Sequence, residues 1–287
     1  MDNFAASSPP TPHAPEAHII IEPAKGWAPI ELKEMWNYRE LLYFLTWRDI
    51  KLRYKQTALG VAWAVLQPVL TMILFSVIFG ELAGLPSGEI PYPIFTYTAL
   101  LPWQLFAFAL TSSSNSLVGN QNLIGKVYFP RLVIPFSSVI AGVLDFFIAF
   151  LVLLGMMIFY DIHISAAIFI LPLFLVLTLA SAMAVGLWLS ALNVQYRDVR
   201  YAVPFLTQLW MYATPIAYSS ELIPEKWRWL YSLNPMTGVV EGFRWVILGE
   251  SGLDTFSLGI SAVVVVVFLI SGLYYFKRSE ATFADVI

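Results

Sequence analysis

The sequence predicts an all-α polytopic membrane protein with six transmembrane helices, preceded by an N-terminal amphipathic helix. Three observations predict this fold class. Only 12% of the 287 residues are charged, whereas a soluble domain carries roughly 25%. Hydrophobic residues make up 59% of the chain, and several apolar runs reach the roughly 20 residues that cross a bilayer core. The basic residues are also distributed unequally between the loops that join these runs.

The N-terminal residues 1–30 predict a disordered cytosolic tail, because "MDNFAASSPPTPHAPEAH" is acidic and rich in Pro, Ser and Ala. A short strand and a turn could form at "HIIIEPAKGW". A cleavable signal peptide is not expected, since the first long apolar run begins only near Gly60. At the other end, residues 281–287 predict a short cytosolic tail.

Composition excludes some chemistry. The chain has no cysteine, which rules out disulfides, thiolate metal sites and a cysteine nucleophile. The net charge of −3 gives no sign of a nucleic-acid partner, and we expect none.

Residues 31–57 predict an amphipathic helix. Its aromatic and apolar positions recur at spacings of 7, 4, 3 and 4, on one stripe of a helix: Trp36, Tyr43, Trp47, Ile50 and Tyr54. Basic residues border this stripe on both sides. Such a pattern is typical of a helix lying in the headgroup plane of a membrane. The alternative is an amphipathic helix packed only against its own protein.

Six apolar segments are long enough to cross a bilayer. They cover residues 60–80, 93–117, 133–160, 166–192, 203–220 and 256–276. The fifth is the least regular, because Pro204 and Pro215 bracket it. With the N-terminus in the cytosol, thirteen of the sixteen Lys and Arg residues fall in inner segments, and only Lys226, Arg228 and Arg244 fall in outer ones. This excess of positive charge predicts that both termini are cytosolic.

The inner loop after the second span reads "VGNQNLIGKVYFPRLVIP" and predicts a short cytosolic helix that Pro130 ends or kinks. It does not match the phosphate-binding pattern G-x-x-x-x-G-K-[ST]. Gly119 and Gly125 are one residue too far apart, and Val127 follows the lysine. If transport uses ATP, another chain must bind it.

The inner loop "LNVQYRDVRY" concentrates Arg197, Asp198 and Arg200 in a short turn. It predicts either a charged membrane anchor or a structured docking point in which Asp198 pairs with an arginine.

Candidate catalytic groups are absent from the sequence. Neither D-x-D nor H-x-x-x-H occurs, and His163 stands alone in a short outer loop. We expect no catalytic residue, no metal site and no cofactor in this chain. Asp145 is the one charged residue clearly inside a span, where an isolated charge is costly. Pairing with a polar group, or a place beside a water-filled path, explains it better than proton coupling, because no relay is visible.

Polar and aromatic side chains in the first and fifth spans predict the lining of a passage. Aromatic faces stack on the C–H faces of sugar rings, and amides donate to hydroxyl groups without binding them tightly. The candidate lining residues are Trp63, Gln67, Phe205, Gln208, Trp210 and Tyr212. For residues near span ends, such as Trp63, the alternative is an interfacial aromatic belt.

The stretch "NPMTGVVEGFRW" lies in the one long outer segment, 221–255. Asn234 and Pro235 predict the cap and first position of a helix. Glu241 and Arg244 then lie at i and i+3 on one face and can pair. Each charge alone would be costly at membrane depth, so the pair favours a short helix in the outer leaflet. The alternative is a weak, exposed surface pair.

Four stretches together resemble a known family: "RDIKLRYKQTALGVAWAVLQPVL", "GNQNLIGKVYFPRLVIP", "LNVQYRDVRY" and "NPMTGVVEGFR". They resemble the permease subunits of bacterial polysaccharide ABC exporters, which serve O-antigen, capsule and teichoic acid export. The similarity covers about residues 35–280 and is greatest to the O-antigen exporters. It implies a permease domain at 58–280 that moves a lipid-linked polysaccharide across the bacterial inner membrane. It also implies a homodimer with two copies of a separate ATP-binding subunit, which would hold ATP and magnesium.

The resemblance further implies roles for particular segments. Spans one and five would line a channel at the dimer interface, and residues 221–255 would form two short re-entrant periplasmic helices. The helix near 119–130 would insert into the ATP-binding subunit, through Asn120, Gln121, Asn122, Leu123, Lys126, Phe129, Pro130 and Arg131. The cytosolic interface would include Trp36, Tyr43, Trp47, Arg53, Tyr54, Arg197 and Asp198. Asn234, Glu241 and Arg244 would shape the periplasmic exit.

Other functions are compatible with parts of this pattern. A permease of the same architecture could export a small lipid or a drug. A membrane glycosyltransferase would need an acidic cluster, which the sequence lacks. A secondary transporter would need more buried charge and, usually, internal repeats.

Overall fold

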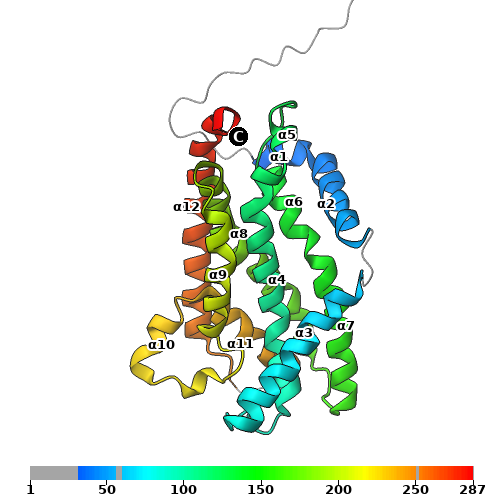
Figure 1. The fold of residues 1–287 in the computed structure, drawn as a ribbon. Coiled ribbons are helices and arrows are strands. Elements are labelled where there is room, and N and C mark those ends of the chain that lie inside the picture. The colour runs from blue at the N-terminus through cyan, green and yellow to red at the C-terminus, as the bar shows by residue number, and fades with distance from the viewer. Residues whose placement is uncertain (1–31, 56–59, 250–251, 287) are drawn as a thin grey trace, which may run out of the picture.

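The computed structural model describes residues 32–55, 60–249 and 252–286, so the tail expected at 1–30 lies outside it. The described residues form helices and turns, with no β-strand among them (Figure 1). The first half contains α1 (Leu32–Asn37), α2 (Arg39–Tyr54), α3 (Ala62–Phe75), η1 (Ser76–Leu82), α4 (Tyr92–Gly119), α5 (Gln121–Ile124), α6 (Val133–Ala141) and α7 (Val143–Phe159). The second half contains η2 (Ala166–Ile170), α8 (Leu171–Gln195), α9 (Val199–Tyr212), η3 (Ser220–Leu222), α10 (Glu225–Tyr231), α11 (Pro235–Leu248) and α12 (Thr255–Val286).

Helix α4 forms the centre of the bundle. In its most apolar stretch 78% of the residues are buried, compared with 11% in the α3–η1 segment. Helix α8 packs along α4 most extensively, and α3, α6, α7, α9 and α11 also contact it. The core therefore follows α4, with fully buried side chains such as Tyr97, Leu100 and Phe106.

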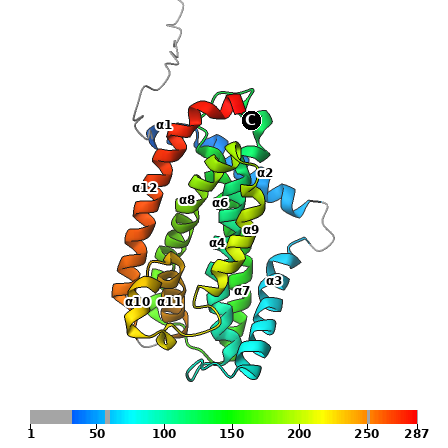
Figure 2. The same ribbon diagram turned by 60° about the vertical axis from the view of Figure 1, so that its left-hand side comes forward.

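The bundle has two distinct ends (Figures 1 and 2). One end carries α1, α2, α5 and the last turns of α12, and we call it the α5 end. The opposite end carries α10 and α11, and we call it the α11 end. The first described helix and the C-terminus therefore lie at the same end of the molecule.

Five helical segments among the described residues are long and apolar enough to cross a membrane. They are Ala62–Leu82, Tyr92–Gly119, Val133–Phe159, Ala166–Gln195 and Thr255–Ala281. Each begins or ends within a few residues of a span predicted from the sequence. The all-helical, multi-pass fold class is thus confirmed.

The fifth predicted span, 203–220, differs from the structure. Helix α9 begins earlier, at Val199, and ends at Tyr212, after which the chain turns over residues 213–219. Pro215 explains this end, because proline has no N–H to donate and disfavours helical geometry at Thr214 before it. With 14 residues, α9 is too short to count among the five candidate spans.

The structure also differs from the predictions for the N-terminal helix and for the C-terminal tail. The helix expected over 31–57 is interrupted at Tyr38, which separates α1 from α2. The tail expected at 281–287 instead continues the last helix, because α12 extends to Val286. In Figure 2 these last turns of α12 bend across the α5 end.

Glycines let α8 and α12 approach their neighbours closely. A Cβ atom at Gly186 of α8 would lie 2.7 Å from Ser113 Oγ of α4, and one at Gly272 of α12 would lie 2.9 Å from the Ala184 carbonyl oxygen. Small residues at such contacts are typical of helix packing in membranes. Beside Gly272, Trp188 stacks on Tyr275 with ring centroids 4.3 Å apart. Helix α12 is therefore fixed against α8 by both backbone proximity and aromatic stacking.

Replacing Gly272 by alanine should destabilise the protein by about 1–3 kcal/mol, because the added methyl group meets a backbone oxygen that cannot turn away. Thermal unfolding of the purified protein in detergent would measure the change. Gly259→Ala is the matched control on the same helix, since a Cβ atom there meets nothing within 4 Å. Equal melting temperatures for the two variants would contradict the close α8–α12 contact.

Candidate functional site

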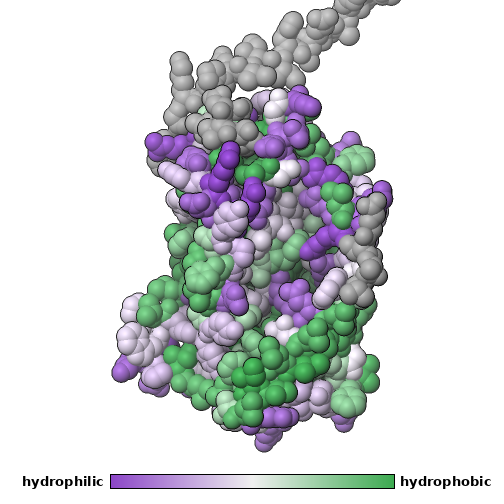
Figure 3. Space-filling model, viewed as in Figure 1, coloured by the Kyte–Doolittle hydropathy of each residue, from purple (hydrophilic) through white to green (hydrophobic). Residues whose placement is uncertain are grey.

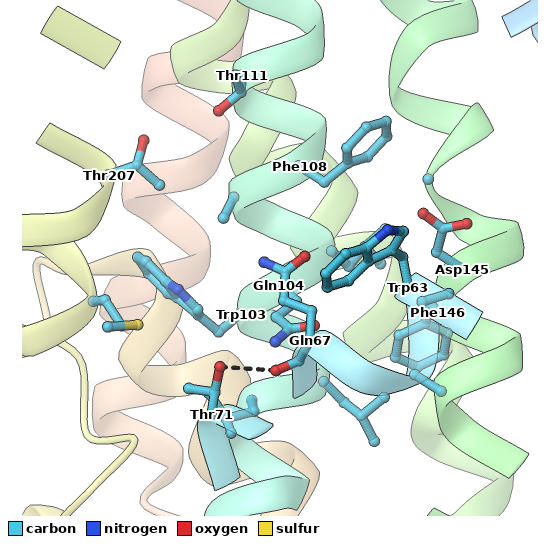
Figure 4. A pocket seen from close by; sticks show the side chains of 18 of the residues that line it. Trp63, Gln67, Thr71, Trp103, Gln104, Phe108, Thr111, Asp145, Phe146 and Thr207 are labelled. Atoms are coloured by element: carbon cyan, nitrogen blue, oxygen red, sulfur yellow. Dashed lines mark hydrogen bonds between the residues drawn. The ribbon is translucent and has the colours of Figure 1, made fainter. Parts of the chain in front are cut away.

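A groove opens on the side of the bundle between α3 and α9, with α4 as its floor (Figure 4). Its volume is about 490 Å³. In Figure 3 hydrophilic patches lie between the apolar surface of α3 and that of α9. We call it the α3–α9 groove. Its polar lining residues are Arg53, Gln67, Thr71, Gln104, Thr111, Asp145, Thr207 and Gln208.

The groove offers amide groups rather than charges along most of its length. The Thr71 hydroxyl donates to the Gln67 carbonyl oxygen at 2.8 Å, and the Thr207 hydroxyl donates to the Val203 carbonyl oxygen at 2.7 Å. The side-chain amides of Gln67, Gln104 and Gln208 make no hydrogen bond within the described part of the chain. These amides are free to bind a ligand or water, and unbonded amides would be costly against lipid.

Aromatic rings supply the rest of the surface. Trp63 of α3 is 54% exposed at the groove, whereas Trp103 on the α4 floor is buried. Phe108 and Phe146 line the groove beside Asp145 (Figure 4). The combination of flat apolar faces and unbonded amides suits a ligand rich in hydroxyl groups, without strong charge on either side.

The predicted channel residues divide into two groups. Trp63, Gln67 and Gln208 meet in the groove. Phe205 and Tyr212 are exposed outside it. Trp210 lies away from the groove, because its ring packs on Phe106 with centroids 5.0 Å apart and its N–H donates to Asn234 Oδ1 at 2.8 Å. Gln104 also lines the groove but was not predicted, because it comes from the buried α4 rather than from a predicted lining span.

Asp145 of α7 lines one end of the groove. Its two carboxylate oxygens accept hydrogen bonds from Arg53 Nη1 and from the Tyr54 hydroxyl, both on α2. The Arg53 guanidinium also lies 3.6 Å from the ring centroid of Phe108 on α4. The charge inside α7 therefore has two partners, as its cost in lipid requires, and α2 is attached to α4 and α7.

Tyr54 remains a donor in this arrangement. Burial is the largest cause that raises the pKa of Tyr54 above its ordinary value, and the hydrogen bond to the Asp145 carboxylate is the second.

The other residues predicted at the cytosolic interface are exposed. Trp36, Tyr43 and Trp47 have exposed rings. Arg197 and Asp198 are exposed as well, and Asp198 forms no ion pair within the described part of the chain.

The predicted contact segment for a partner lies at the α5 end. Helix α5 covers only Gln121–Ile124 and ends well before Pro130, so the helix expected near 119–130 is shorter than predicted. Gln121, Asn122 and Lys126 are exposed, and Asn120 donates to the Ser116 carbonyl oxygen at 2.8 Å. The remaining predicted residues point inward to different degrees: Phe129 is buried, while Leu123, Pro130 and Arg131 are half-buried.

At the α11 end, Asn234 forms the predicted helix cap. Its Oδ1 accepts from the Met236 N–H at 3.1 Å, with Pro235 in the first turn. Its amide nitrogen donates to the Ala213 carbonyl oxygen at 3.1 Å and to Thr214 Oγ1 at 3.0 Å. One residue thus joins the start of α11 to the turn that follows α9.

Arg244 of α11 is 2% exposed and binds the same turn. Its Nη2 donates to the Ile216 carbonyl oxygen at 2.8 Å, and its Nη1 donates to the Tyr218 carbonyl oxygen at 3.3 Å. The guanidinium also lies 3.6 Å from the ring centroid of Phe95 on α4. These carbonyl and aromatic contacts stabilise the buried Arg244 guanidinium. The pairing of Arg244 with Glu241 stays a prediction.

Hydrogen bonds also order the rest of this end. The Tyr218 and Tyr231 hydroxyls bond to each other, and burial raises the pKa of Tyr231. Asp254 precedes α12 and accepts from the Ser257 hydroxyl at 2.6 Å. That bond lowers the pKa of Asp254, so the carboxylate stays ionised where it caps the helix.

These features define a class: a multi-pass membrane protein with a polar, amide-lined groove between its spans, as a transport protein requires. The chain belongs to the ABC-2 type transporter family, whose sequence profile matches residues 40–248. It is therefore a transport subunit rather than an enzyme, and the family resemblance of the sequence is confirmed.

Curated relatives agree with this family. The O-antigen export system permease protein RfbA of Klebsiella pneumoniae is 31% identical over 86% of this chain and 95% of its own length. The protein of the same name from Myxococcus xanthus is 28% identical over 89% of this chain and 98% of its own length. The polysialic acid transport protein KpsM of Escherichia coli is 25% identical, over 81% of this chain and 91% of its own length.

Arg53 and Asp145 should show energetic coupling. Arg53→Met and Asp145→Asn should each destabilise the protein, and the double variant should lose about 0.5–3 kcal/mol less than their sum. Unfolding of the four proteins in detergent measures the coupling. The Arg48–Asp49 pair is the control, because these adjacent residues of α2 join no second helix, and it should couple by less than about 1 kcal/mol. If the destabilisations caused by Arg53→Met and Asp145→Asn were strictly additive, the Arg53–Asp145 pair would not attach α2 to α7.

Arg244→Ala should destabilise the protein by about 2–5 kcal/mol, because the buried Ile216 carbonyl oxygen and the part-buried Tyr218 carbonyl oxygen both lose their donor. Arg228→Ala, an exposed change on α10, should cost less than about 1 kcal/mol. Denaturant unfolding in detergent distinguishes the two. If both variants were equally stable, Arg244 would not hold the turn after α9.

Proposed function

We propose that this chain is the transmembrane subunit of an ATP-driven exporter that moves a lipid-linked, O-antigen-like polysaccharide across the bacterial inner membrane. The observation that carries the proposal is the α3–α9 groove, whose unbonded amides and aromatic faces match a polyhydroxylated chain. The relatives named as O-antigen and polysialic acid transporters support the same class of substrate.

The groove would become a closed channel in a homodimer. It is open along the side of a single chain, and apolar residues on both of its rims are exposed. Leu70 and Leu74 of α3 are 56% and 55% exposed, and Tyr201 and Phe205 of α9 are 78% and 62% exposed. A second copy facing these rims would cover them and enclose the amides.

The orientation follows from charge. Thirteen of the sixteen Lys and Arg residues belong to segments assigned to the inside by the sequence, which favours a cytosolic α5 end and cytosolic termini. Helices α1 and α2 would then lie at the cytosolic interface, with exposed Trp36 of α1 and Tyr43 and Trp47 of α2 toward the headgroups.

The sixth crossing is proposed to be composite. Helix α9 rises about 21 Å over its 14 residues, which is less than the roughly 30 Å core of a bilayer. The turn that Arg244 and Asn234 hold would complete the passage to the outside, with α10 and α11 as re-entrant helices.

The energy would come from a separate ATP-binding subunit, present in two copies. Exposed Gln121, Asn122 and Lys126 form its proposed contact on this chain. ATP and magnesium would be held by that subunit. Closure of the paired ATP-binding subunits would displace the α5 end and shift the two permease copies relative to each other.

Reconstitution tests the function. Proteoliposomes containing this chain, the cognate ATP-binding subunit and lipid-linked polysaccharide should move the polysaccharide in an ATP-dependent manner. Omission of the ATP-binding subunit should abolish transport. Transport that persisted without it, or transport of a small lipid in preference to the polysaccharide, would contradict the proposal.

A groove variant makes the test specific. Gln67→Phe should reduce polysaccharide transport about tenfold or more, because a bulky ring replaces an amide in the lining, a change worth on the order of 1–3 kcal/mol. Ile73→Phe is the control, because Ile73 lies on the same helix, is 49% exposed, and is neither a groove residue nor one of the rim residues named above. Equal transport by both variants would exclude the groove as the path.

A further inference from the structure

We propose that the last turns of α12 clamp the coupling segment, residues 119–131, through Arg131 and Glu280 as positioning residues. The inference rests on the proposed function, in which this segment meets the ATP-binding subunit. It assigns α12 a part in transmitting movement.

Contacts between residues 149 positions apart form the clamp. Arg131 Nη1 donates to the Glu280 carbonyl oxygen, and the Arg131 backbone N–H donates to Glu280 Oε1 at 3.3 Å. The guanidinium lies 6.0 Å from the ring centroid of Phe283. Lys277 Nζ lies 2.8 Å from Glu280 Oε2. Backbone and side chain of Glu280 therefore both hold Arg131, and Lys277 fixes the carboxylate.

Aromatic packing surrounds these polar contacts. Phe276 and Phe283, one above the other on α12, are fully buried with centroids 5.3 Å apart. Phe129 of the coupling segment is buried in the same hydrophobic core. Such contacts are stiffer than a surface ion pair, because moving Arg131 away from α12 would disturb buried aromatic rings.

The coupling segment consequently has two different sides. Gln121, Asn122, Lys126 and Val127 are exposed, whereas Phe129 and Arg131 face the protein. The exposed side is open to a partner while the inner side is attached to α12. A push on the exposed side is therefore applied to α12 as well as to the neighbouring α4 and α6.

Helix α12 extends from the clamp to the α11 end of the bundle. Over its 32 residues an α-helix rises about 48 Å, which is enough to connect the two ends of the bundle. At the α11 end, the Ser261 hydroxyl donates to the Ser232 carbonyl oxygen at 3.0 Å, and the Ser232 and Ser257 hydroxyls bond at 2.7 Å. One continuous helix thus joins the clamp to the helices proposed to form the exit.

Spin labelling tests the clamp directly, because the chain has no native cysteine. Labels at Val127→Cys and Ala281→Cys, both exposed, should give a narrow distance distribution in the full chain. Arg131→Ala and Glu280→Ala should broaden it. Glu280→Gln keeps a side-chain oxygen acceptor that Glu280→Ala removes, so it should broaden the distribution less than Glu280→Ala does. Arg278→Ala, an exposed neighbour with the same charge as Arg131, should leave it unchanged.

The functional test uses the complete reconstituted complex. Glu280→Ala should raise the ATP hydrolysed per polysaccharide exported by about threefold or more, with Arg278→Ala as the control. An unchanged distance distribution would overturn the clamp, and an unchanged ratio would overturn its part in transmitting movement. If Glu280→Ala fails to fold, Glu280→Gln replaces it, and each outcome has the same meaning.

The proposed function and the clamp can be refuted by different results. Absence of export by the unsubstituted complex would refute the proposed function. The distance distributions need no partner and no substrate, so they decide the clamp in either case.

Discussion

The enclosure of α4 is the constraint on which the rest of the structure depends. A helix buried on nearly all sides must be surrounded by others, and here α3, α6, α7, α8, α9 and α11 occupy its circumference. The incomplete cover between α3 and α9 is what leaves the groove. The floor of the candidate passage is therefore the most buried of the five candidate spans, while the α3–η1 segment that forms one wall is the least buried of them.

The buried or half-buried charges Asp145 and Arg244 both have partners on other segments of the chain. Asp145 is bonded from α2, and Arg244 is bonded to carbonyl oxygens that a broken helix leaves without donors. In both places the charge joins segments that are distant in the sequence. Charged residues thus act as structural attachments, joining α2 to α4 and α7 in one place and α11 to the turn after α9 in the other.

The helical, multi-pass architecture could be predicted because apolar length alone determines which segments can cross a bilayer. The cap at Asn234 was equally predictable, since it depends on neighbouring residues. The partners of Arg53 and Arg131 were not, because they lie 92 and 149 positions away and no local pattern encodes them. The groove was predicted in part: Gln67 and Gln208 lie in spans with visible polarity, but Gln104 belongs to a helix whose buried surroundings only the tertiary structure reveals.

The end of α9 at Tyr212 has a consequence for the surrounding lipid. A helix shorter than the hydrocarbon core creates a hydrophobic mismatch, which a membrane relieves by thinning, by admitting water or by bringing protein surfaces together. On this face the bilayer would be deformed around a single chain and much less around two chains that share the short helix. The thickness of the lipid would then influence the balance between monomer and assembly, and membranes with longer acyl chains would favour the assembled form.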